Sequence, residues 1–454
     1  MTGRLIVVAN RLPVHRVGNR WERSPGGLVT AMEPVLANRR GVWIGWTGTH
    51  GRSPRGFAHE GLDIRPVAMS LRELDLFYDG MCNRTFWPLY HDAVRTPEFH
   101  RAWWNSYQEV NLRFARAAAR VVRKGDTVWI HDYQLQLVPR MLREMRPGVR
   151  IGFFLHIPFP PEELFAWLPW RKPILQGLLG ADVVGFQTPE NFHNFSRLCR
   201  RYTAAEGTGS ELAYEGRTVR VGSFPISIDF AHFEAIASRP EVQAEARAIR
   251  RRLGPNRKVI LCVDRLDYTK GIDGRLRAFE EMLRRGDCPV DRCVMVQIAV
   301  PSRERVPEYD AMRTLVEQTV GRINGEYSLP GMVAAHYFRR NLAREQLIAY
   351  YLAADVMLVT PLRDGMNLVA KEYIASRTDN TGVLVLSESA GAAKELRQAV
   401  IVNPHDIDGL SASLVQALRM PREQARRRMI ISRMQVRRHD VAFWAESFLE
   451  ALHR

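Results

Sequence analysis

The feature of this sequence that most restricts its fold is a series of short, uninterrupted apolar runs. Nine of them stand between amphipathic stretches, at residues 5–9, 127–131, 151–156, 183–186, 259–263, 294–299, 356–360, 383–386 and 399–402. Few alternate between apolar and polar residues, so they are typical of strands that are buried on both faces. A parallel sheet covered by helices provides that burial, and the sequence therefore predicts an α/β protein.

The runs fall into two series, which predicts two doubly wound domains. The first series extends from residue 5 to about 225 and the second from 259 to 402. A crossing segment at 224–229 and a charge-rich helical stretch at 239–252 separate them. Ligands of such folds bind outside the carboxyl ends of the strands and between domains. Unusual residues that follow a strand are therefore the candidates for a functional site.

The net charge of +16 does not by itself indicate a nucleic-acid partner. Only six of the 65 basic residues are lysine and 59 are arginine, a skew typical of a GC-rich genome. The excess is spread over both halves of the chain, without a basic arm. A nucleic-acid-binding or regulatory protein that keeps the fold without turnover is the alternative from another class. Salt-dependent DNA binding with a steep slope would support it.

Membrane and secreted classes are disfavoured. No window of about 18 residues is continuously apolar, and the N-terminal segment lacks the long apolar stretch of a signal peptide. The five cysteines are odd in number and include no C-x-x-C pair. The pattern therefore disfavours zinc ribbons and disulfide frameworks, and a reducing cytoplasm is expected.

Polar residues follow the strands of the first series. Asn10 and Arg11 come after the first run, and Gly26 and Gly27 lie in the next loop. Paired glycines let backbone amides approach a phosphate or sugar closely, and an ordinary turn is the alternative. Asp132 follows the run at 127–131, where it either binds sugar hydroxyls or caps a helix.

His156 ends the run at 151–156 and stands before a loop with three prolines. The prolines fix the loop, and a rigid loop is often found where a side chain must be aimed. A buried core histidine is the alternative.

Two cations follow one strand of the second series. Arg265 and Lys270 lie within six residues of each other after the run at 259–263. Two cations at a strand mouth suit a diphosphate, whose charge must be neutralised as it leaves. A surface ion pair with Asp264 or Asp267 is the alternative. Another basic loop, which contains Arg303, follows the run at 294–299.

The run at 356–360 leads into a Gly-containing loop and then a helix start. We expect the helix N-terminus near Asn367 to present free amides to a phosphate, and Glu372 to hold ribose hydroxyls. The small-residue turn at 387–393 suits close packing or ligand approach. Two segments only imitate functional motifs: D-I-D-G at 406–409 lacks the threonine of a phosphatase motif, and the arginines of 422–438 have the spacing of a solvated amphipathic face.

Taken together, these stretches resemble retaining glycosyltransferases of the trehalose-6-phosphate synthase family. About eleven motifs match in order along nearly the whole chain: ANR at 9–11, GGL at 26–28, W-x-G-W at 43–46, NRTFWPLYH at 83–91, WIHDYQL at 129–135, IGFFLHIPFP at 151–160, GFQT at 185–188, DRLDYTKG at 264–271, GRINGEY at 321–327, TPLRDGMNLVAKEY at 360–373 and GVLVLSESAGAA at 382–393.

The resemblance implies the GT-B fold, with two Rossmann-like doubly wound domains that face each other across a cleft. It implies an acceptor-side domain at 1–228, a donor-side domain at 229–435 and a C-terminal helix at 436–454 that crosses back to the first domain. The implied reaction transfers glucose from a nucleoside diphosphate glucose (UDP- or GDP-glucose) to glucose 6-phosphate and yields α,α-trehalose 6-phosphate. No metal, cofactor, nucleic-acid or membrane partner is implied, and we expect a cytoplasmic dimer or tetramer.

The resemblance also assigns roles to residues. For acceptor binding it implies Arg11, Tyr78, Trp87, Asp132 and Arg303, with the two arginines on the phosphate. For donor binding it implies Gly26, Gly27, His156, Arg265, Lys270, Leu342, Asp364, Gly365, Met366, Asn367, Leu368, Val369 and Glu372. The expected catalytic residues are Asp132, His156, Arg265 and Lys270.

No motif supplies an obvious carboxylate nucleophile for a double displacement. The family's front-face substitution is therefore expected, in which the leaving phosphate takes the acceptor's proton. Leu342 stands where some family members place a phenylalanine against the base, so the base stays open between uridine, guanosine and adenosine. The closest alternative keeps the chemistry and changes the acceptor to glycerol 3-phosphate or a cyclitol phosphate.

Overall fold

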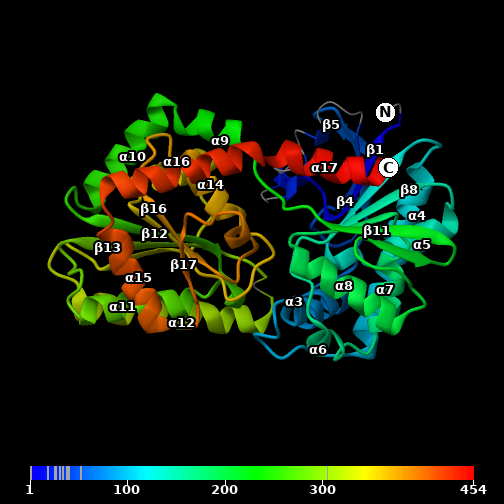
Figure 1. The fold of residues 1–454 in the computed structure, drawn as a ribbon, viewed down its shortest axis with the longest axis horizontal. Coiled ribbons are helices and arrows are strands. Elements are labelled where there is room, and N and C mark those ends of the chain that lie inside the picture. The colour runs from blue at the N-terminus through cyan, green and yellow to red at the C-terminus, as the bar shows by residue number, and fades with distance from the viewer. Residues whose placement is uncertain are drawn as a thin grey trace. The chain divides into compact units, whose positions relative to one another are not determined.

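The computed structural model describes residues 3–17, 20–24, 28–29, 32, 35–36, 41–51, 54–303 and 305–454. The chain divides into two compact units (Figure 1). One comprises Met1–Ile226 and Val441–Arg454, and the other comprises Ser227–Asp440. None of the helices in the described parts of the chain combines the length and apolar character that a membrane crossing requires.

The first unit is built on a nine-stranded sheet. Its strands are β1 (Leu5–Arg11), β4 (Val42–Trp46), β5 (Phe57–His59), β6 (Leu62–Val67), β7 (Thr127–His131), β8 (Arg150–Phe154), β9 (Val183–Phe186), β10 (Glu211–Tyr214) and β11 (Arg217–Ser223). Their order is β10-β11-β9-β8-β7-β1-β4-β6-β5, and only the pairings at the two edges, β10 with β11 and β5 with β6, are antiparallel. The strands β2 (Val14–Val17) and β3 (Arg20–Arg23) form a separate hairpin.

The helical segments of the first unit include a long amphipathic helix and a π-helix. They are α2 (Leu71–Glu73), the π-helix η1 (Leu74–Phe86), α3 (Trp87–Tyr90), α4 (Arg101–Val121), η2 (Tyr133–Leu135), α5 (Val138–Met145), α6 (Glu162–Phe165), α7 (Arg171–Leu178), α8 (Pro189–Tyr202) and α17 (Val441–His453).

Helix α17 completes the core of the first unit. The ring of Phe448 stacks on Trp129 of β7, with centroids 4.6 Å apart and planes 6° apart. A Cβ atom on Gly152 or Gly185 would come within 2.6 and 2.7 Å of the same phenylalanine ring. Glycine at these two positions therefore lets α17 lie directly on strands β8 and β9.

The second unit is built on six parallel strands. They are β12 (Lys258–Arg265), β13 (Cys293–Val300), β14 (Ala335–Phe338), β15 (Val356–Val359), β16 (Val383–Ser387) and β17 (Val400–Val402), in the order β14-β13-β12-β15-β16-β17. Its helices are α9 (Phe230–Ala237), α10 (Pro240–Leu253), η3 (Tyr268–Lys270), α11 (Ile272–Arg284), α12 (Pro307–Tyr327), α13 (Arg344–Ala353), α14 (Leu368–Ser376), η4 (Gly391–Lys394), α15 (Ile407–Leu418) and α16 (Arg422–Arg438).

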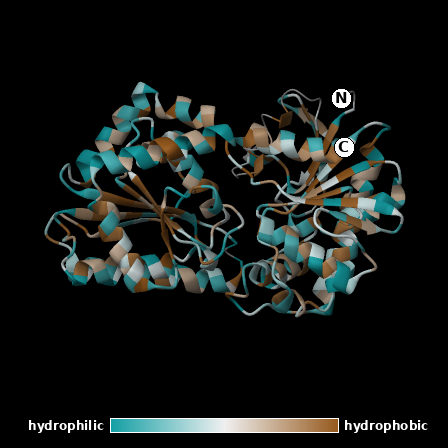
Figure 2. Cartoon of the chain, in the orientation of Figure 1, coloured by the Kyte–Doolittle hydropathy of each residue, from teal (hydrophilic) through white to brown (hydrophobic). Residues whose placement is uncertain are grey.

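The nine apolar runs of the sequence lie in strands of these two sheets, and the prediction of an α/β fold is confirmed. Figure 2 shows strongly hydrophobic strands inside each unit and helices with hydrophilic outer surfaces. This pattern follows from the physical requirement that a parallel sheet bury both of its faces.

Each sheet has one switch point, where the direction of winding reverses. In the first unit the chain runs outward from β1 to β4 and β6, then returns to pair β7 with the other side of β1. In the second unit β13 and β15 flank β12 in the same way. Ligands of doubly wound sheets bind outside the carboxyl ends of the strands at this reversal. Residues that follow β1, β7, β12 and β15 are therefore the candidates for a binding site.

Candidate functional site

Arg11 at the switch point of the first unit is held by an aromatic ring and a glycine. The register between β1 and β4 shifts between Val8 and Arg11, a bulge of the kind that re-aims a side chain. The Arg11 guanidinium lies 4.6 Å from the centroid of the Trp46 ring. A Cβ atom on Gly48 would come within 2.6 Å of this guanidinium. The ring of Tyr78 lies 5.9 Å from the Trp46 ring, so the structure brings Arg11 and Tyr78 to the same tryptophan.

Tyr78 and Trp87 come from an unusual helical segment. Tyr78 lies on the π-helix η1, which is 13 residues long, and α3 follows it directly with Trp87. Long π-helical turns are rare and are often found at functional sites. Trp87 is buried, and its ring lies 5.8 Å from that of Tyr133. Trp87 therefore lies beneath the surface and supports the neighbouring aromatic ring.

Asp132 has a left-handed backbone, with φ of 74°. Its carboxylate makes no capping hydrogen bond to the 3-10 turn η2 that follows. Instead it accepts a hydrogen bond of 3.1 Å from the backbone N–H of His156. The helix-capping alternative is therefore wrong, and Asp132 ties the carboxyl end of β7 to that of β8. A strained backbone of this kind is often found at functional sites.

His156 is largely buried but keeps part of its surface accessible, whereas His131 is fully buried. His156 Nε2 lies 3.1 Å from His131 Nδ1. Burial lowers the pKa of His156 to about 3 and also lowers the pKa of His131 well below its ordinary value. Both imidazoles are therefore neutral at physiological pH. His156 can exchange hydrogen bonds with a ligand without carrying charge.

In the second unit Lys270 is paired with the loop after β15. Its Nζ donates a hydrogen bond of 2.6 Å to Asp364, and Asn367 Nδ2 donates one of 3.1 Å to the same carboxylate oxygen. The Oδ1 of Asn367 accepts from the Ala370 amide and caps α14. Asn367 has φ of 81°, which aims it into this network. The ion-pair partner of the Lys270 side chain is thus Asp364, and neither Asp264 nor Asp267, the two partners considered from sequence.

Arg275 was not singled out from the sequence, yet it joins the two strands of the switch point. Its guanidinium donates to Asp264 of β12, to Thr360 Oγ1 after β15 at 3.1 Å, and to the Lys270 carbonyl at 2.5 Å. The side chain is completely buried. A Cβ atom on Gly271 would come within 2.2 Å of the Thr360 carbonyl oxygen, so this contact requires glycine. Arg275 therefore positions the backbone that carries Lys270.

Asp267 holds two arginines at the carboxyl ends of the neighbouring strands β12 and β13. Arg303 donates hydrogen bonds of 2.7 Å to Asp267 and to the Tyr309 hydroxyl. Arg265 lies 4.0 Å from the same carboxylate, with 44% of its side chain exposed. Burial by itself would raise the pKa of Asp267, but the charges of Arg303 and Arg265 lower that pKa well below its usual range. Arg303 thus lies in the second unit, whereas Arg11 lies in the first.

The small-residue turn at 387–393 supports the loop that contains Asp364 and Met366. The Gly391 amide donates to the Asp364 carbonyl at 3.2 Å, and the Ala392 amide donates to the Met366 carbonyl at 2.8 Å. A Cβ atom on Gly391 would come within 1.9 Å of the Gly365 carbonyl oxygen. Of the two roles considered for this turn, the structure shows close packing.

The remaining predicted donor residues are more scattered. Leu368 and Val369 open α14, directly after Asn367. Glu372 is half-buried and accepts a hydrogen bond of 2.9 Å from Tyr351, and burial raises the pKa of its carboxyl. Leu342 is half-buried between β14 and α13. The predicted residues Gly26 and Gly27 lie outside the described residues.

The segments 406–409 and 422–438, which resemble functional motifs in sequence, have structural roles. Asp406 caps α15 by accepting from the Gly409 amide at 2.9 Å. Helix α16 presents most of its arginines to solvent, as predicted, but Arg433 is buried and donates to the carbonyls of Ile374 and Ala375 and to Glu234. The solvated-face interpretation is therefore wrong for this one arginine.

Comparisons with known proteins cover the whole chain. Residues 3–454 match Glycosyltransferase family 20. The trehalose-6-phosphate synthase of Mycolicibacterium smegmatis is 53% identical, with 99% of this chain and 92% of that protein covered. The trehalose-6-phosphate synthase of Mycobacterium tuberculosis (strain ATCC 25618 / H37Rv) is 51% identical, with 98% and 94% covered.

Two solved structures are similar over the same length. One is an α,α-trehalose-phosphate synthase (UDP-forming) of Burkholderia xenovorans in complex with glucose-6-phosphate, with a TM-score of 0.93, 34% identity and 100% of both chains covered. The other is a trehalose-6-phosphate protein of E. coli bound with UDP-2-fluoro glucose, with a TM-score of 0.92, 34% identity and 99% of both chains covered.

Proposed function

The chain belongs to glycosyltransferase family 20, and we propose that it is a trehalose-6-phosphate synthase of GT-B fold. It transfers glucose from a nucleoside diphosphate glucose to glucose 6-phosphate with retention of configuration and forms α,α-trehalose 6-phosphate. The observation that carries this conclusion is 53% identity to a synthase with 99% of this chain covered. Clusters of polar residues at the switch points of both sheets, Arg11 in the first unit and Lys270 with Asp364 in the second, support it.

For the acceptor, we assign the phosphate of glucose 6-phosphate to Arg11 and Arg303. Guanidinium groups bind phosphate oxygens in pairs, and the Trp46 ring fixes the plane of the Arg11 fork. Asp132 accepts hydrogen bonds from the sugar hydroxyls. Tyr78 forms the aromatic side of the pocket, and the buried Trp87 shapes it from beneath.

For the donor, Arg265 and Lys270 neutralise the diphosphate as it leaves. The amides of Leu368 and Val369 open α14 and add the positive end of its dipole. Glu372 binds the ribose. The donor glucose contacts His156 and the loop formed by Asp364, Gly365, Met366 and Asn367. The diphosphate is approached by Gly26 and Gly27.

The proposed mechanism is front-face substitution through an oxocarbenium-like state. The leaving phosphate accepts the proton of the acceptor hydroxyl, so no protein base has to be charged. A neutral His156 is consistent with this mechanism. It can orient a glucose hydroxyl by hydrogen bonding, and its low pKa keeps it from competing with the leaving phosphate for the acceptor's proton. The protein contributes orientation of the two sugars and stabilisation of the charge on the diphosphate.

We propose UDP-glucose as the preferred donor, with Leu342 against the base. Two relatives support this proposal: the B. xenovorans enzyme is UDP-forming, and the E. coli protein was solved with UDP-2-fluoro glucose. Turnover of glucose 6-phosphate with UDP-, GDP- and ADP-glucose, followed by detection of the phosphorylated disaccharide, tests both proposals. Product from none of the donors overturns the function, and equal rates with all three overturn the preference.

The same assay tests the acceptor. Glycerol 3-phosphate and a cyclitol phosphate are compared with glucose 6-phosphate at equal concentration, and we expect product from glucose 6-phosphate only.

A cytoplasmic location is proposed from the five cysteines, which are all free thiols. A dimer or tetramer is proposed from the family, and light scattering measures it.

A further inference from the structure

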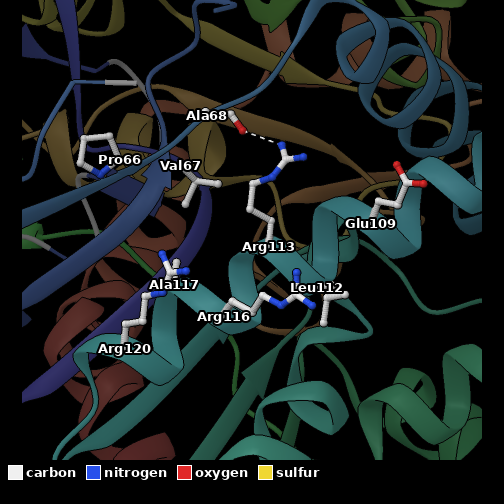
Figure 3. A pocket seen from close by; sticks show the side chains of 9 residues that line it. All are labelled: Pro66, Val67, Ala68, Glu109, Leu112, Arg113, Arg116, Ala117 and Arg120. Carbon is white, nitrogen blue, oxygen red and sulfur yellow. Dashed lines mark hydrogen bonds between the residues drawn. The ribbon is translucent and has the colours of Figure 1, made fainter. Parts of the chain in front are cut away.

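A cavity of about 590 Å³ lies on the first unit. It begins beside the Arg11 cluster, since its lining residue Val67 of β6 is the register partner of Trp46 of β4. Helix α4 forms one wall and the end of β6 forms the other (Figure 3). Its volume is within the range of small-molecule sites. None of the residues assigned above to the donor or the acceptor lines this cavity, so the proposed reaction does not account for it.

Three arginines of α4 line the cavity. Arg113, Arg116 and Arg120 are three and four positions apart, so they lie on one face of the helix. Figure 3 shows Arg113 pointing to Ala68, whereas Arg116 extends toward Leu112. Arg113 is fixed by hydrogen bonds to the Ala68 carbonyl at 2.8 Å and to Glu73 at 3.0 Å.

The other two arginines are differently placed. Arg116 and Arg120 are exposed, and no residue in the described ranges forms a hydrogen bond or an ion pair with either of them. Some exposed arginines have acidic partners, such as Arg277 with Asp273 at 3.1 Å and Arg284 with Glu281 at 2.6 Å. Others, such as Arg426 and Arg427, have none among the described residues but do not line a cavity with apolar surface. Like charges one turn apart repel each other, and an anion bound between them would remove that repulsion.

The rest of the lining restricts the chemical class of the anion. Val67 and Leu112 supply apolar surface next to the arginines, and Glu109 is the one acidic residue of the lining. An inorganic ion gains nothing from contact with the apolar side chains, whereas the carbon skeleton of an organic anion can pack on them. The Cα atoms of Arg116 and Arg120 are separated by about 6 Å along the helix axis. That spacing suits two anionic groups on one molecule.

We propose that this cavity binds an organic bisphosphate, with one phosphoryl group on Arg116, the other on Arg120, and the carbon skeleton on Val67 and Leu112. Guanidinium groups bind phosphate through paired, charge-assisted hydrogen bonds, which makes arginine the suitable residue at both positions.

The test is calorimetric titration of fructose 1,6-bisphosphate into the full chain saturated with UDP and glucose 6-phosphate, which keep the substrate subsites filled. We expect one bisphosphate per chain. The double variant Arg116→Ala/Arg120→Ala should bind it about 100-fold more weakly, through the loss of two charged contacts. Leu112→Trp, which fills the cavity and keeps the charge, should weaken binding as well.

The matched control is Arg426→Ala/Arg427→Ala on the exposed face of α16, which removes the same charge from the second unit. It should bind the bisphosphate as the unmodified chain does, and thermal unfolding verifies that each variant is folded. Absence of bisphosphate binding at millimolar concentration overturns the proposal. So does equal weakening in the control, or binding of inorganic phosphate as tightly as the bisphosphate. The comparison among variants holds even if the proposed substrates do not bind.

Discussion

Lys270 donates a hydrogen bond of 2.6 Å to Asp364, which lies 94 positions further along the chain. The two residues follow β12 and β15, the neighbouring strands at the switch point of the second unit. The same carboxylate accepts from Asn367, the cap of α14. One acidic side chain therefore sets the position of both a cation and a helix N-terminus, the two features that the proposed diphosphate site requires.

Alanine in place of Lys270 or Arg265 should lower turnover by about 10²–10³-fold, because each removes a charge that stabilises the leaving diphosphate. Stability should separate the two variants. Arg265 is 44% exposed, so its loss should change the free energy of unfolding by less than about 0.5 kcal/mol. Loss of Lys270 leaves the largely buried Asp364 without its cation and should cost about 3 kcal/mol.

Steady-state kinetics and urea denaturation measure these two effects. Arg277→Ala, which breaks an exposed ion pair on α11, is the control and should change neither. Near-normal turnover in Arg265→Ala or Lys270→Ala would contradict the assignment of the diphosphate site.

Arg275→Ala should destabilise the chain by about 3–5 kcal/mol, because it leaves the Asp264 carboxylate buried without a partner. Arg275→Lys keeps the charge but loses the planar fork that reaches Thr360 and the Lys270 carbonyl. We expect the lysine variant to fold and to show a raised KM for the nucleotide sugar with an unchanged KM for glucose 6-phosphate. A KM that rises equally for both substrates would show that Arg275 is only structural.

Gly48→Ala should raise the KM for glucose 6-phosphate about tenfold or more, because the new Cβ displaces the Arg11 guanidinium from the Trp46 ring. The donor KM should stay unchanged. Gly51→Ala is the matched control: Gly51 also has a positive φ, of 103°, but a Cβ there meets nothing within 4 Å. If both variants weaken the acceptor equally, backbone strain explains the effect and Arg11 does not.

The free energy of unfolding should fall as the pH drops below about 6.5. His131 and His156 have lowered pKa values in the fold, so below the unfolded pKa of about 6.5 the unfolded chain binds more protons than the folded one. Their contribution is therefore intact above that pH and is lost toward the folded pKa, which for His156 is about 3. Each histidine adds a slope of up to about 1.4 kcal/mol per pH unit.

Urea denaturation between pH 7 and 5 measures this slope. His156→Asn should reduce the slope by the share of one histidine, whereas His405→Asn, at an exposed position of the second unit, should leave it unchanged. A slope that is the same in the unmodified chain and in His156→Asn would refute the proposed protonation states.

The parts of the fold that could be predicted are those in which burial shows directly in the residue types. Strands β1, β7 and β12 are almost completely buried, so their apolar runs were readable. Strand β11 is only partly buried and mixes polar with apolar residues, so no such run marked it. The π-helix η1 had no recognisable periodicity either, because its geometry depends on the packing around it.

The same distinction applies to the site. Lys270 and Asp364 were found because each follows an apolar run. Arg275 was missed because its burial arises from the contact between β12 and β15, and nothing local distinguishes it among 59 arginines. Trp46 belongs to a quoted motif, but its role became visible only when β4 was placed beside β1.

The place of α17 in the first unit has a consequence for how the protein is made. Phe448 and Trp444 of α17 pack on Trp129 of β7. Because α17 follows the second unit in the sequence, the segment Met1–Ile226 leaves the ribosome long before this helix has been translated. The whole second unit is synthesised in the interval. The surface of β7 to β9 that α17 covers therefore stays uncovered until this helix has been made and has left the ribosome. A premature stop in α17 would yield a finished second unit beside an incomplete first one.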